Sequence, residues 1–371
     1  MTVTKGLEGI VATTSSVSSI IDGVLTYRGY DIDDLAVNAT YEEVVHLLWY
    51  GKLPNKAELD KLHTELSANA AVSQQVIDQL RAYPKDANSM AVLRTAVSAL
   101  ALFDEEANDM SLEANYRKAI RLQAQLPTIV AAFARIRQGL EPVAPKLNAA
   151  VAENFLYMLT GKAPDKVAIE ALDKALVLHA DHELNASTFA ARVTVATLSD
   201  MYSGVTSAIG ALRGPLHGGA NEEVMAMLEE IGDMDNVERY IQDKLDNKEK
   251  IMGFGHRVYK NGDPRAKHLQ KMSYELGKLT NNMKWYEMSV KIEEMVTGMK
   301  GLKPNVDFYS ASVYTALEIP RDLFTPIFAI SRVSGWTAHI LEQYENNRLI
   351  RPRAEYVGPT DQKVVPIAQR A

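Results

Sequence analysis

The chain places one histidine between a pair of glycines and a group of cations. His256 follows Gly253-Phe254-Gly255, and the two glycines give this stretch unusual backbone freedom. Three cations come after it, namely Arg257, Lys260 and Arg265. One titratable imidazole among fixed positive charges suits the binding of an anionic small molecule better than a packed core. A solvated basic loop with an incidental histidine is the alternative interpretation.

Two further histidines have unusual surroundings. His217 lies in Gly214-Pro215-Leu216-His217-Gly218-Gly219, which ends one predicted helix and opens the next. The N-terminus of a helix lowers the pKa of a nearby histidine, so the ring stays neutral and donates a single hydrogen bond. The alternative interpretation is a helix–helix turn with a surface histidine that has no function. His182 precedes Glu183-Leu184-Asn185.

Three charged residues in the last quarter of the chain are further candidates. Asp307 stands at a predicted helix start in Asn305-Val306-Asp307, where a carboxylate most often serves as a cap. Arg332 interrupts an apolar helical run, and a buried guanidinium requires an anionic partner from protein or substrate. Arg351 belongs to a basic cluster near the C-terminus, for which a solvated tail is the alternative.

A metal site is a minor alternative. His179 and His182 can share a helix face, with Glu183 beside them. The His-Glu-x-x-His order of zinc hydrolases is absent, however. The sequence therefore predicts no metal, and a metal-dependent hydrolase is the least favoured enzyme class.

Composition excludes several other classes. The 371 residues carry a net charge of −7, which argues against nucleic acid or an anionic membrane as the main partner. The absence of cysteine excludes disulfides, thiolate metal sites and a cysteine nucleophile. No apolar run approaches the roughly 18 residues that a membrane span needs. A cytoplasmic protein is therefore expected.

The elements that must position these residues are predicted to be almost all helices. Residues 18–27 predict a short β-hairpin around Asp22-Gly23. Thr40 and Glu43 predict a capping box at a helix start. Helical patterns follow to residue 344, and Ala186–Leu212, rich in small residues, predicts a helix pressed between others or at a subunit interface.

Taken together, these segments resemble the citrate synthase family, most closely its short Bacillus-type bacterial members. The resemblance covers nearly the whole chain, and the order and spacing of its histidine and aspartate segments are highly specific. A small departure is Asn88-Ser89-Met90, where many bacterial relatives have His-Pro-Met. The matching segments are Tyr27-Arg28-Gly29-Tyr30, Leu93-Arg94-Thr95, His182-Glu183-Leu184-Asn185, Gly214–Gly218, Gly253–Arg265, Asn305-Val306-Asp307, Ser331-Arg332 and Arg351-Pro352.

The resemblance implies an all-α homodimer with two domains in each subunit. The large domain would comprise residues 1–218 and 330–371, and a smaller mobile domain residues 219–329. The implied reaction, a step of the tricarboxylic acid cycle, condenses acetyl-CoA with oxaloacetate and hydrolyses the thioester to citrate and CoA. It needs no cofactor, because acetyl-CoA is a substrate.

The family match also implies catalytic roles for three residues. Asp307 would take a proton from the thioester methyl group, while neutral His217 hydrogen-bonds the developing enolate oxygen. His256 would polarise the oxaloacetate ketone and protonate the new alkoxide.

Further residues would bind the substrates. By the same match, His182, Arg265 and Arg332 bind oxaloacetate, and Arg351 reaches into the partner subunit's site for the same purpose. Arginine forks suit the two planar carboxylates. Arg257 and Lys260 are then candidates for the CoA phosphates.

The same residues leave two alternative functions open. A 2-methylcitrate synthase would use propionyl-CoA with the same catalytic set, since one methylene contributes only about 1–3 kcal/mol to discrimination. A non-catalytic helical scaffold would leave the histidine and aspartate segments unexplained.

Overall fold

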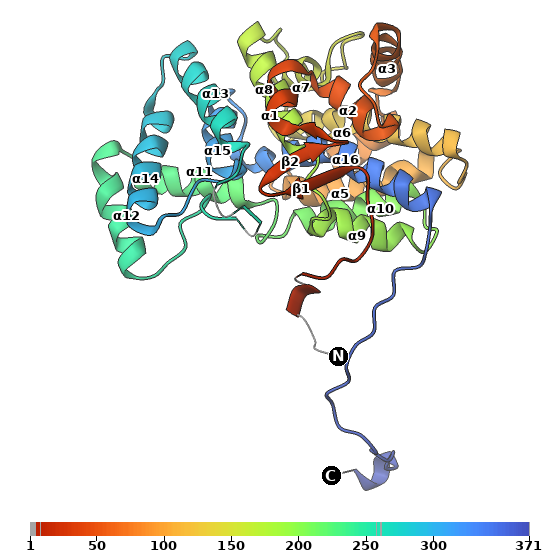
Figure 1. Ribbon diagram of the computed structural model, residues 1–371. Helices are drawn as coiled ribbons and strands as arrows, with labels where there is room; N and C mark the ends of the chain where they lie inside the picture. Colours follow the sequence, from red (N-terminus) through yellow and green to blue (C-terminus); the bar gives the residue numbers. More distant parts are fainter. Residues whose placement is uncertain (1–4, 8, 257, 260–261, 371) are drawn as a thin grey trace.

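The computed structural model describes residues 5–7, 9–256, 258–259 and 262–370. Within these residues the chain forms sixteen α-helices, five short 3₁₀ helices and one small sheet (Figure 1). The expected all-α class is confirmed. The α-helices are α1 Ile32–Asn38, α2 Tyr41–Tyr50, α3 Lys56–Asn69, α4 Gln74–Ala82, α5 Ser89–Leu100, α6 Leu112–Ile136, α7 Val151–Thr160, α8 Lys166–His179, α9 Ala186–Val195, α10 Met201–Leu212, α11 Ala220–Ile231, α12 Val237–Asp246, α13 Ala266–Leu279, α14 Lys284–Lys300, α15 Val306–Ala316 and α16 Phe324–Glu345. The 3₁₀ helices are η1 Lys5–Leu7, η2 Ala101–Phe103, η3 Met234–Asn236, η4 Arg321–Leu323 and η5 Ile367–Gln369.

The N-terminal sheet confirms the predicted hairpin and adds a strand. β1 (Ser18–Ile21) pairs antiparallel with β2 (Val24–Tyr27), in the register Ser18 to Tyr27. Asp22 and Gly23 both have positive φ, as the tight hairpin turn requires. β3 (Tyr30–Asp31) then pairs with β2 over two residues, too short a run for the alternating pattern to reveal it.

Helix α2 begins with the predicted capping box. The Thr40 side chain accepts from the Glu43 main chain, and the Glu43 carboxylate accepts from the Thr40 N–H. Gly51, in the left-handed conformation, ends the helix. Local sequence therefore determined both ends of this element.

Helix α16 runs through the middle of the larger group of helices (Figure 1). Nearly all its side chains from Phe324 to Leu341 are buried, and α2, α6, α8, α9 and α10 pack around it. The small-residue stretch predicted as one helix forms two, α9 and α10. They are separated at Leu198, which has a positive φ, and Asp200, which caps α10. Their close packing follows from small residues: a β-carbon on Gly204 would lie 2.6 Å from Val195.

Helices α11 to α15 gather on one side of the molecule (Figure 1). α13 packs against α15 and α14, and α12 packs against α14. This group meets the rest of the chain where α13 and α15 contact α8 and where α11 contacts α16. Lys267 and His268 of α13 also contact Asp33 of α1, at 2.5 and 2.6 Å.

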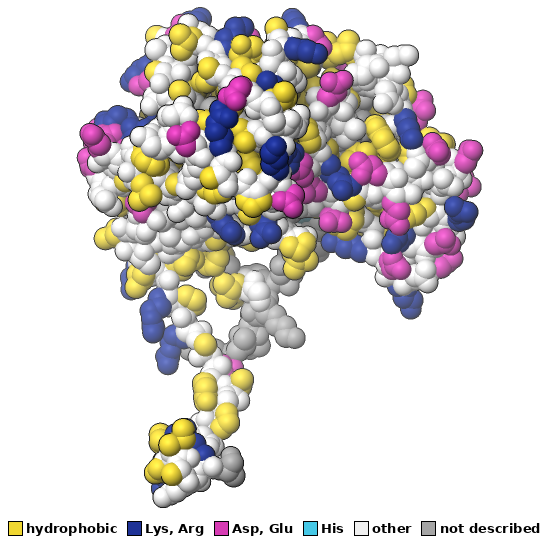
Figure 2. Space-filling view, turned by 180° about the vertical axis from the view of Figure 1, so that it is seen from behind, with side chains coloured by type: hydrophobic (Ala, Val, Ile, Leu, Met, Phe, Trp, Pro, Cys, Tyr) yellow, Lys and Arg dark blue, Asp and Glu magenta, His cyan; other side chains and the backbone are white. Residues whose placement is uncertain are grey.

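The C-terminal segment after α16 is exposed and mostly irregular. It runs away from the helical body and ends near the short η5 (Figure 1). Positive and negative side chains are interspersed over the face seen in Figure 2. In the described part of the chain, no helix is both long and apolar enough to cross a membrane.

Candidate active site

A cleft with a volume of about 890 Å³ lies where residues 253–265 and the start of α15 face α9 and α16. Six of the predicted site residues line it: His182, His217, His256, Arg265, Asp307 and Arg332. They come from five separate parts of the chain, so only the tertiary fold brings them together. The volume is within the range of small-molecule sites.

His182 lies in a tight turn just after α8. The next residue, Glu183, has a positive φ, which turns the chain from α8 toward α9. His182 Nε2 is 3.0 Å from the Tyr259 hydroxyl, and its ring lies edge-on to His256 with centroids 5.3 Å apart. Burial, followed by the charges of nearby arginines, lowers the pKa of His182 well below its ordinary value. The ring is therefore neutral at pH 7.

His217 lies in the turn between α10 and α11, as the glycine-rich motif predicts. Its Nε2 is 2.8 Å from the Ser187 hydroxyl. Burial and then the charge of Arg332 lower the pKa of His217 to about 4. The neutral ring expected from the sequence is confirmed, but burial rather than a helix terminus is the main cause.

His256 is oriented by its own main chain. Gly253 and Gly255 have positive φ, and His256 Nδ1 accepts from the N–H groups of Val258 and Tyr259 at 3.0 and 3.2 Å. Burial and the charge of Arg265 lower the pKa of His256 to about 4. A neutral imidazole whose Nδ1 accepts carries its proton on Nε2, so Nε2 is the donor left for a ligand.

Asp307 stands in the first turn of α15 but does not cap it. The capping side chain is Asn305, which accepts from the Asp307 N–H at 3.1 Å. Asp307 Oδ1 is buried and has no hydrogen-bond partner among the described residues. Burial raises the pKa of Asp307 to about 7. The cap alternative is therefore wrong, and the carboxylate has the properties of a general base.

The two buried arginines of the cleft differ in their partners. Arg265 forms a bidentate ion pair with Asp263, with nitrogen–oxygen distances of 2.9 and 2.8 Å. Arg332 donates from Nε to the His179 carbonyl at 2.6 Å, and its guanidinium lies over the Phe328 ring. Burial lowers the pKa of Arg332 to about 10, so it remains a cation at neutral pH. Arg332 therefore brings positive charge to the cleft and forms no ion pair with a carboxylate of the described residues.

The remaining predicted site residues lie elsewhere. Arg351 is exposed in the segment after α16 and does not line this subunit's cleft. Arg257 and Lys260 fall outside the described residues. The structure thus adds no contact for the predicted CoA phosphate ligands.

Four residues that sequence reasoning missed support the site. Tyr259 bonds His182, Ser187 bonds His217, Asp263 pairs with Arg265, and Phe328 packs beneath Arg332. Asp263 stood within a recognised motif, and a carboxylate two residues before a buried arginine was a usable signal. The contacts of Tyr259 and Ser187 join segments 77 and 30 residues apart, which no local pattern reveals. Phe328 lies four residues before Arg332 on α16, so their spacing was also a usable signal.

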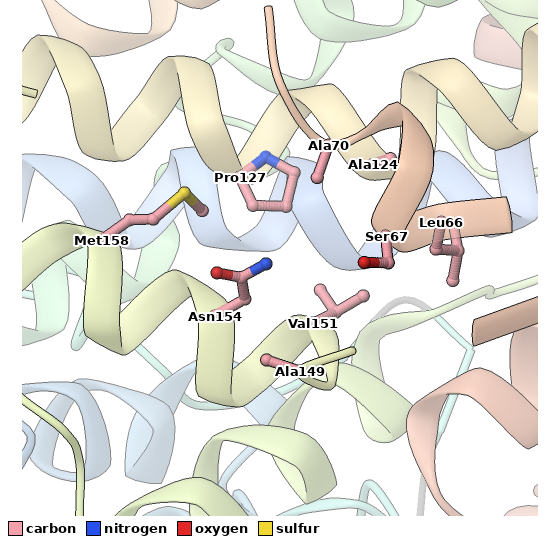
Figure 3. Close-up of a pocket in the computed structure, with 9 residues that line it drawn as sticks. All are labelled: Leu66, Ser67, Ala70, Ala124, Pro127, Ala149, Val151, Asn154 and Met158. Carbon is pink, nitrogen blue, oxygen red and sulfur yellow. The ribbon is translucent and has the colours of Figure 1, made fainter. Parts of the chain in front are cut away.

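No metal cluster appears in the described part of the chain. His179 Nδ1 bonds the Ala175 carbonyl within its own helix, and no described group of three or more acidic or histidine side chains is arranged to hold a metal. A small hollow lies between α3, α6 and α7 (Figure 3). Its volume of about 20 Å³ admits about one water, which is too little for a substrate. It is lined by Leu66, Ser67, Ala70, Ala124, Pro127, Ala149, Val151, Asn154 and Met158.

Comparison with known proteins identifies the family. The family model for the citrate synthase C-terminal domain matches residues 6–353. The chain belongs to the citrate synthase family. It is 66% identical to citrate synthase 2 of Bacillus subtilis, with 100% of both chains covered. It is also 44% identical to 2-methylcitrate synthase 1 of Corynebacterium glutamicum, with 99% of this chain and 98% of that protein covered.

A solved relative extends the comparison to three dimensions. The citrate synthase of Thermoplasma acidophilum, solved as a ternary complex with carboxymethyl coenzyme A and oxaloacetate, matches with a TM-score of 0.93. The two chains are 38% identical, and 100% of each is covered. The present chain is therefore an enzyme of this family with the same fold, and the predicted family resemblance is confirmed.

Proposed function

We propose that His217, His256 and Asp307 carry out the citrate synthase reaction in this enzyme. Acetyl-CoA is condensed with oxaloacetate, and the citryl thioester is hydrolysed to citrate and CoA. The observation that carries the assignment of residues is the state of Asp307, a buried carboxylate with an unpartnered oxygen and a pKa of about 7. It faces the same cleft as three neutral imidazoles and two arginines.

Asp307 is the base that removes a proton from the thioester methyl group. This group is a very weak acid, so the developing enolate oxygen must be stabilised while the proton leaves. A carboxylate with a pKa near 7 is a stronger base than an ordinary aspartate and is still largely ionised at slightly alkaline pH.

His217 stabilises the enolate by donating from Nδ1. A neutral ring carries one proton, so Nε2 must then accept from the Ser187 hydroxyl. Ser187 has further contacts that bear on this arrangement. Trp336 Nε1 donates to Ser187 Oγ at 3.0 Å, so the hydroxyl proton has two acceptors in reach, His217 Nε2 at 2.8 Å and Asn185 Oδ1 at 2.7 Å. Asn185 Oδ1 also receives the N–H groups of Ser187 and Thr188, so it stays satisfied when the hydroxyl turns to His217.

His256 acts on the second substrate. Its Nδ1 is occupied by two main-chain N–H groups, so its Nε2–H donates to the ketone oxygen of oxaloacetate. As the new carbon–carbon bond forms, the ketone becomes an alkoxide and takes the proton from Nε2. The arrangement thus supplies an acid, His256, for oxaloacetate and a base, Asp307, for acetyl-CoA.

His182, Arg265, Arg332 and Arg351 bind the oxaloacetate carboxylates. Arg332 is suited to this because it is buried and charged, and its hydrogen bond goes to the His179 carbonyl, a neutral group. Arg265 shares its charge with Asp263, so its contribution is mainly a fixed orientation. Arg351 comes from the partner subunit of a homodimer, which accounts for its exposed position in a segment that leaves its own body.

The wider organisation completes the proposal. Arg257 and Lys260 bind CoA phosphates, and the enzyme uses no cofactor. Residues 219–329 form a small domain that moves against residues 1–218 and 330–371 and shields the enolate from water. The homodimer is cytoplasmic, with neither nucleic acid nor membrane as a partner.

The decisive test is oxaloacetate-dependent release of free thiol from acetyl-CoA, measured before and after exhaustive chelation. Release that persists after chelation supports the proposal and removes the metal-dependent hydrolase. No release of CoA in the presence of oxaloacetate would contradict it.

A second candidate is 2-methylcitrate synthesis from propionyl-CoA, favoured by the relative in Corynebacterium glutamicum. One methylene changes discrimination by about 1–3 kcal/mol, so both thioesters can be turned over at one site. The ratio of kcat/KM for acetyl-CoA and propionyl-CoA decides which substrate this enzyme prefers.

A further inference from the structure

One face of α16 is pressed against the turn that carries His182. Arg332, Gly335 and His339 are spaced three and four residues apart, so they share a helix face. Arg332 donates to the His179 carbonyl, and His339 contacts the Asp181 carboxylate. Gly335 allows the close approach, because a β-carbon there would collide with the Ala180 carbonyl and Asp181 Oδ1.

Asp181, directly before His182, is held on its other side by the N-terminal hairpin. Ser18 of β1 donates to Asp181 Oδ2 and accepts from the Glu183 N–H at 2.9 Å. The Tyr27 hydroxyl of β2 contacts both the Asp181 N–H and its carbonyl, at 3.2 and 3.0 Å. Both the side chain and the main chain of Asp181 are thus fixed from two elements.

The contact with His339 has a defined direction. Arg192 Nη1 lies 3.1 Å from His339 Nδ1, and a guanidinium only donates, so Nδ1 must accept. The ring therefore carries its proton on Nε2 and donates to Asp181 Oδ2, 3.2 Å away. Glu342 balances the Arg192 charge at 2.6 Å. These contacts determine that Oδ2 of Asp181 accepts the hydrogen bond from His339.

A fully buried carboxylate is costly unless it is hydrogen-bonded or balanced by charge. Asp181 nevertheless leaves Oδ1 without a partner among the described residues. A neutral side chain would support the same turn at lower cost if shape were the only requirement. The negative charge therefore has a use: it favours the charged form of Arg332 and so raises the pKa that burial lowers.

We propose that Asp181 is a positioning residue for oxaloacetate binding. Held by Ser18 and His339, it fixes the turn that aims His182 into the cleft, and its charge helps to keep Arg332 buried and correctly placed. Asp181 acts through His182 and Arg332 and does not touch the substrate itself. The proposal rests on the function proposed above, because it takes His182 and Arg332 as oxaloacetate ligands.

The chain offers a closely matched control. Ser89 is also a buried serine that donates to an aspartate, Asp322, at 2.6 Å, but it does not line the cleft. Ser18→Ala and Ser89→Ala therefore remove the same kind of hydrogen bond from two places. Ser18→Thr restores the hydroxyl and suits a strand.

The test measures oxaloacetate binding by calorimetry and kcat at saturating substrates, with melting temperatures for every variant. We expect Ser18→Ala to weaken oxaloacetate binding about tenfold, which corresponds to about 1.4 kcal/mol. Its kcat should stay within about twofold of wild type, because Asp307, His217 and His256 keep their places. Ser89→Ala should keep the wild-type Kd, and Ser18→Thr should recover most of the loss.

Equal oxaloacetate affinity in Ser18→Ala and Ser89→Ala would overturn the proposal, even if both variants melt at a lower temperature. Asp181→Asn, which keeps the shape of the side chain and removes its charge, is a second test of the proposal. If it folds, its affinity for oxaloacetate must fall at least as far as that of Ser18→Ala. A wild-type enzyme that neither binds oxaloacetate nor releases CoA would instead refute the proposed function itself.

Discussion

The two walls of the cleft are held in opposite ways. On the first wall, formed by residues 179–187 and α16, Arg332 bonds a main-chain carbonyl and Asp181 bonds both Ser18 and His339. On the second wall, formed by residues 253–256 and the start of α15, Asp307 Oδ1 has no described partner. His256 on that wall is oriented through Nδ1, which accepts from its own main chain.

This difference separates binding from chemistry. A side chain that must hold an anion gains from a rigid hydrogen-bonded setting, because its geometry is then fixed before the ligand arrives. A base gains from the opposite treatment, since every hydrogen bond to its carboxylate would lower its pKa and weaken it. The first wall is therefore suited to fixing oxaloacetate, and the second to moving protons.

The largest expected effect removes the base from the second wall. Asp307→Asn keeps the shape of the side chain, while Asn305 continues to cap α15. We expect kcat to fall by about 10²–10⁴-fold, the usual contribution of a general base. At pH 5, where wild-type Asp307 is also neutral, the melting temperature should barely change, because no hydrogen bond to Oδ1 is lost. Turnover near the wild-type rate would end the assignment of Asp307.

A complementation experiment asks whether the first wall is complete within one subunit. We expect Arg351→Ala and His256→Ala homodimers each to be almost inactive. In a mixed dimer, one of the two sites receives both intact residues. Random pairing makes about half of the dimers mixed, so co-refolding should restore roughly a quarter of wild-type activity.

Mass spectrometry must show that mixed dimers have formed. A mixture that contains them and stays inactive would place Arg351 in its own subunit's site. Near-normal activity of Arg351→Ala alone would make this residue a solvated cation of the tail.

The coupling between the walls should be measurable as a change in affinity. In the proposed complex, oxaloacetate contacts Arg332 on the first wall and His256 on the second, so it should favour the state in which both are close. We expect a non-reactive acetyl-CoA analogue to bind about tenfold more tightly when oxaloacetate is present, a typical coupling. Calorimetry with and without oxaloacetate measures this, and equal affinities would contradict it.

The smallest expected effect is the pH dependence of kcat/KM that results from the titration of Asp307 on the second wall. With the pKa of Asp307 at about 7, kcat/KM should halve near that pH and fall further as the carboxylate is protonated. Stability changes in the opposite direction. Because the folded pKa lies above the ordinary value of 3.8, this group's contribution to stability is present at low pH and lost as pH rises through 7.

Asp307→Asn separates the two effects. Its stability relative to wild type should increase as the pH is raised from 5 to 8, as thermal melts at each pH would show. A constant difference in melting temperature would mean that the pKa of Asp307 is not raised.

Sequence sufficed for the elements with local causes. The hairpin around Asp22-Gly23 and the capping box at Thr40 depend on residues that are neighbours in the chain, and both were predicted correctly. The break between α9 and α10 was missed because small residues continue through it, and only the positive φ at Leu198 and the cap at Asp200 reveal it.

The candidate site was likewise predictable only where the signal is local in the sequence. His217, His256 and Asp307 could be singled out from their motifs, because the proposed chemistry requires residues of those types. The contacts of Ser187 with His217 and of Ser18 with Asp181 join segments 30 and 163 residues apart. Such long-range pairs depend on helix packing, which a local pattern does not encode.

The tight glycine turn at Gly253 also determines what can change during a domain movement. A β-carbon there would lie 2.7 Å from Phe308 and 2.8 Å from Val224, so only glycine lets this strand of backbone dock onto α15 and α11. Its carbonyl accepts from Asn305, and the Gly255 N–H donates to Lys303. In the proposed mechanism, the proton donor His256 and the proton acceptor Asp307 thus lie on backbone segments that are hydrogen-bonded to each other. In the proposed domain movement their separation should stay nearly constant, while the distance from both to His217 changes.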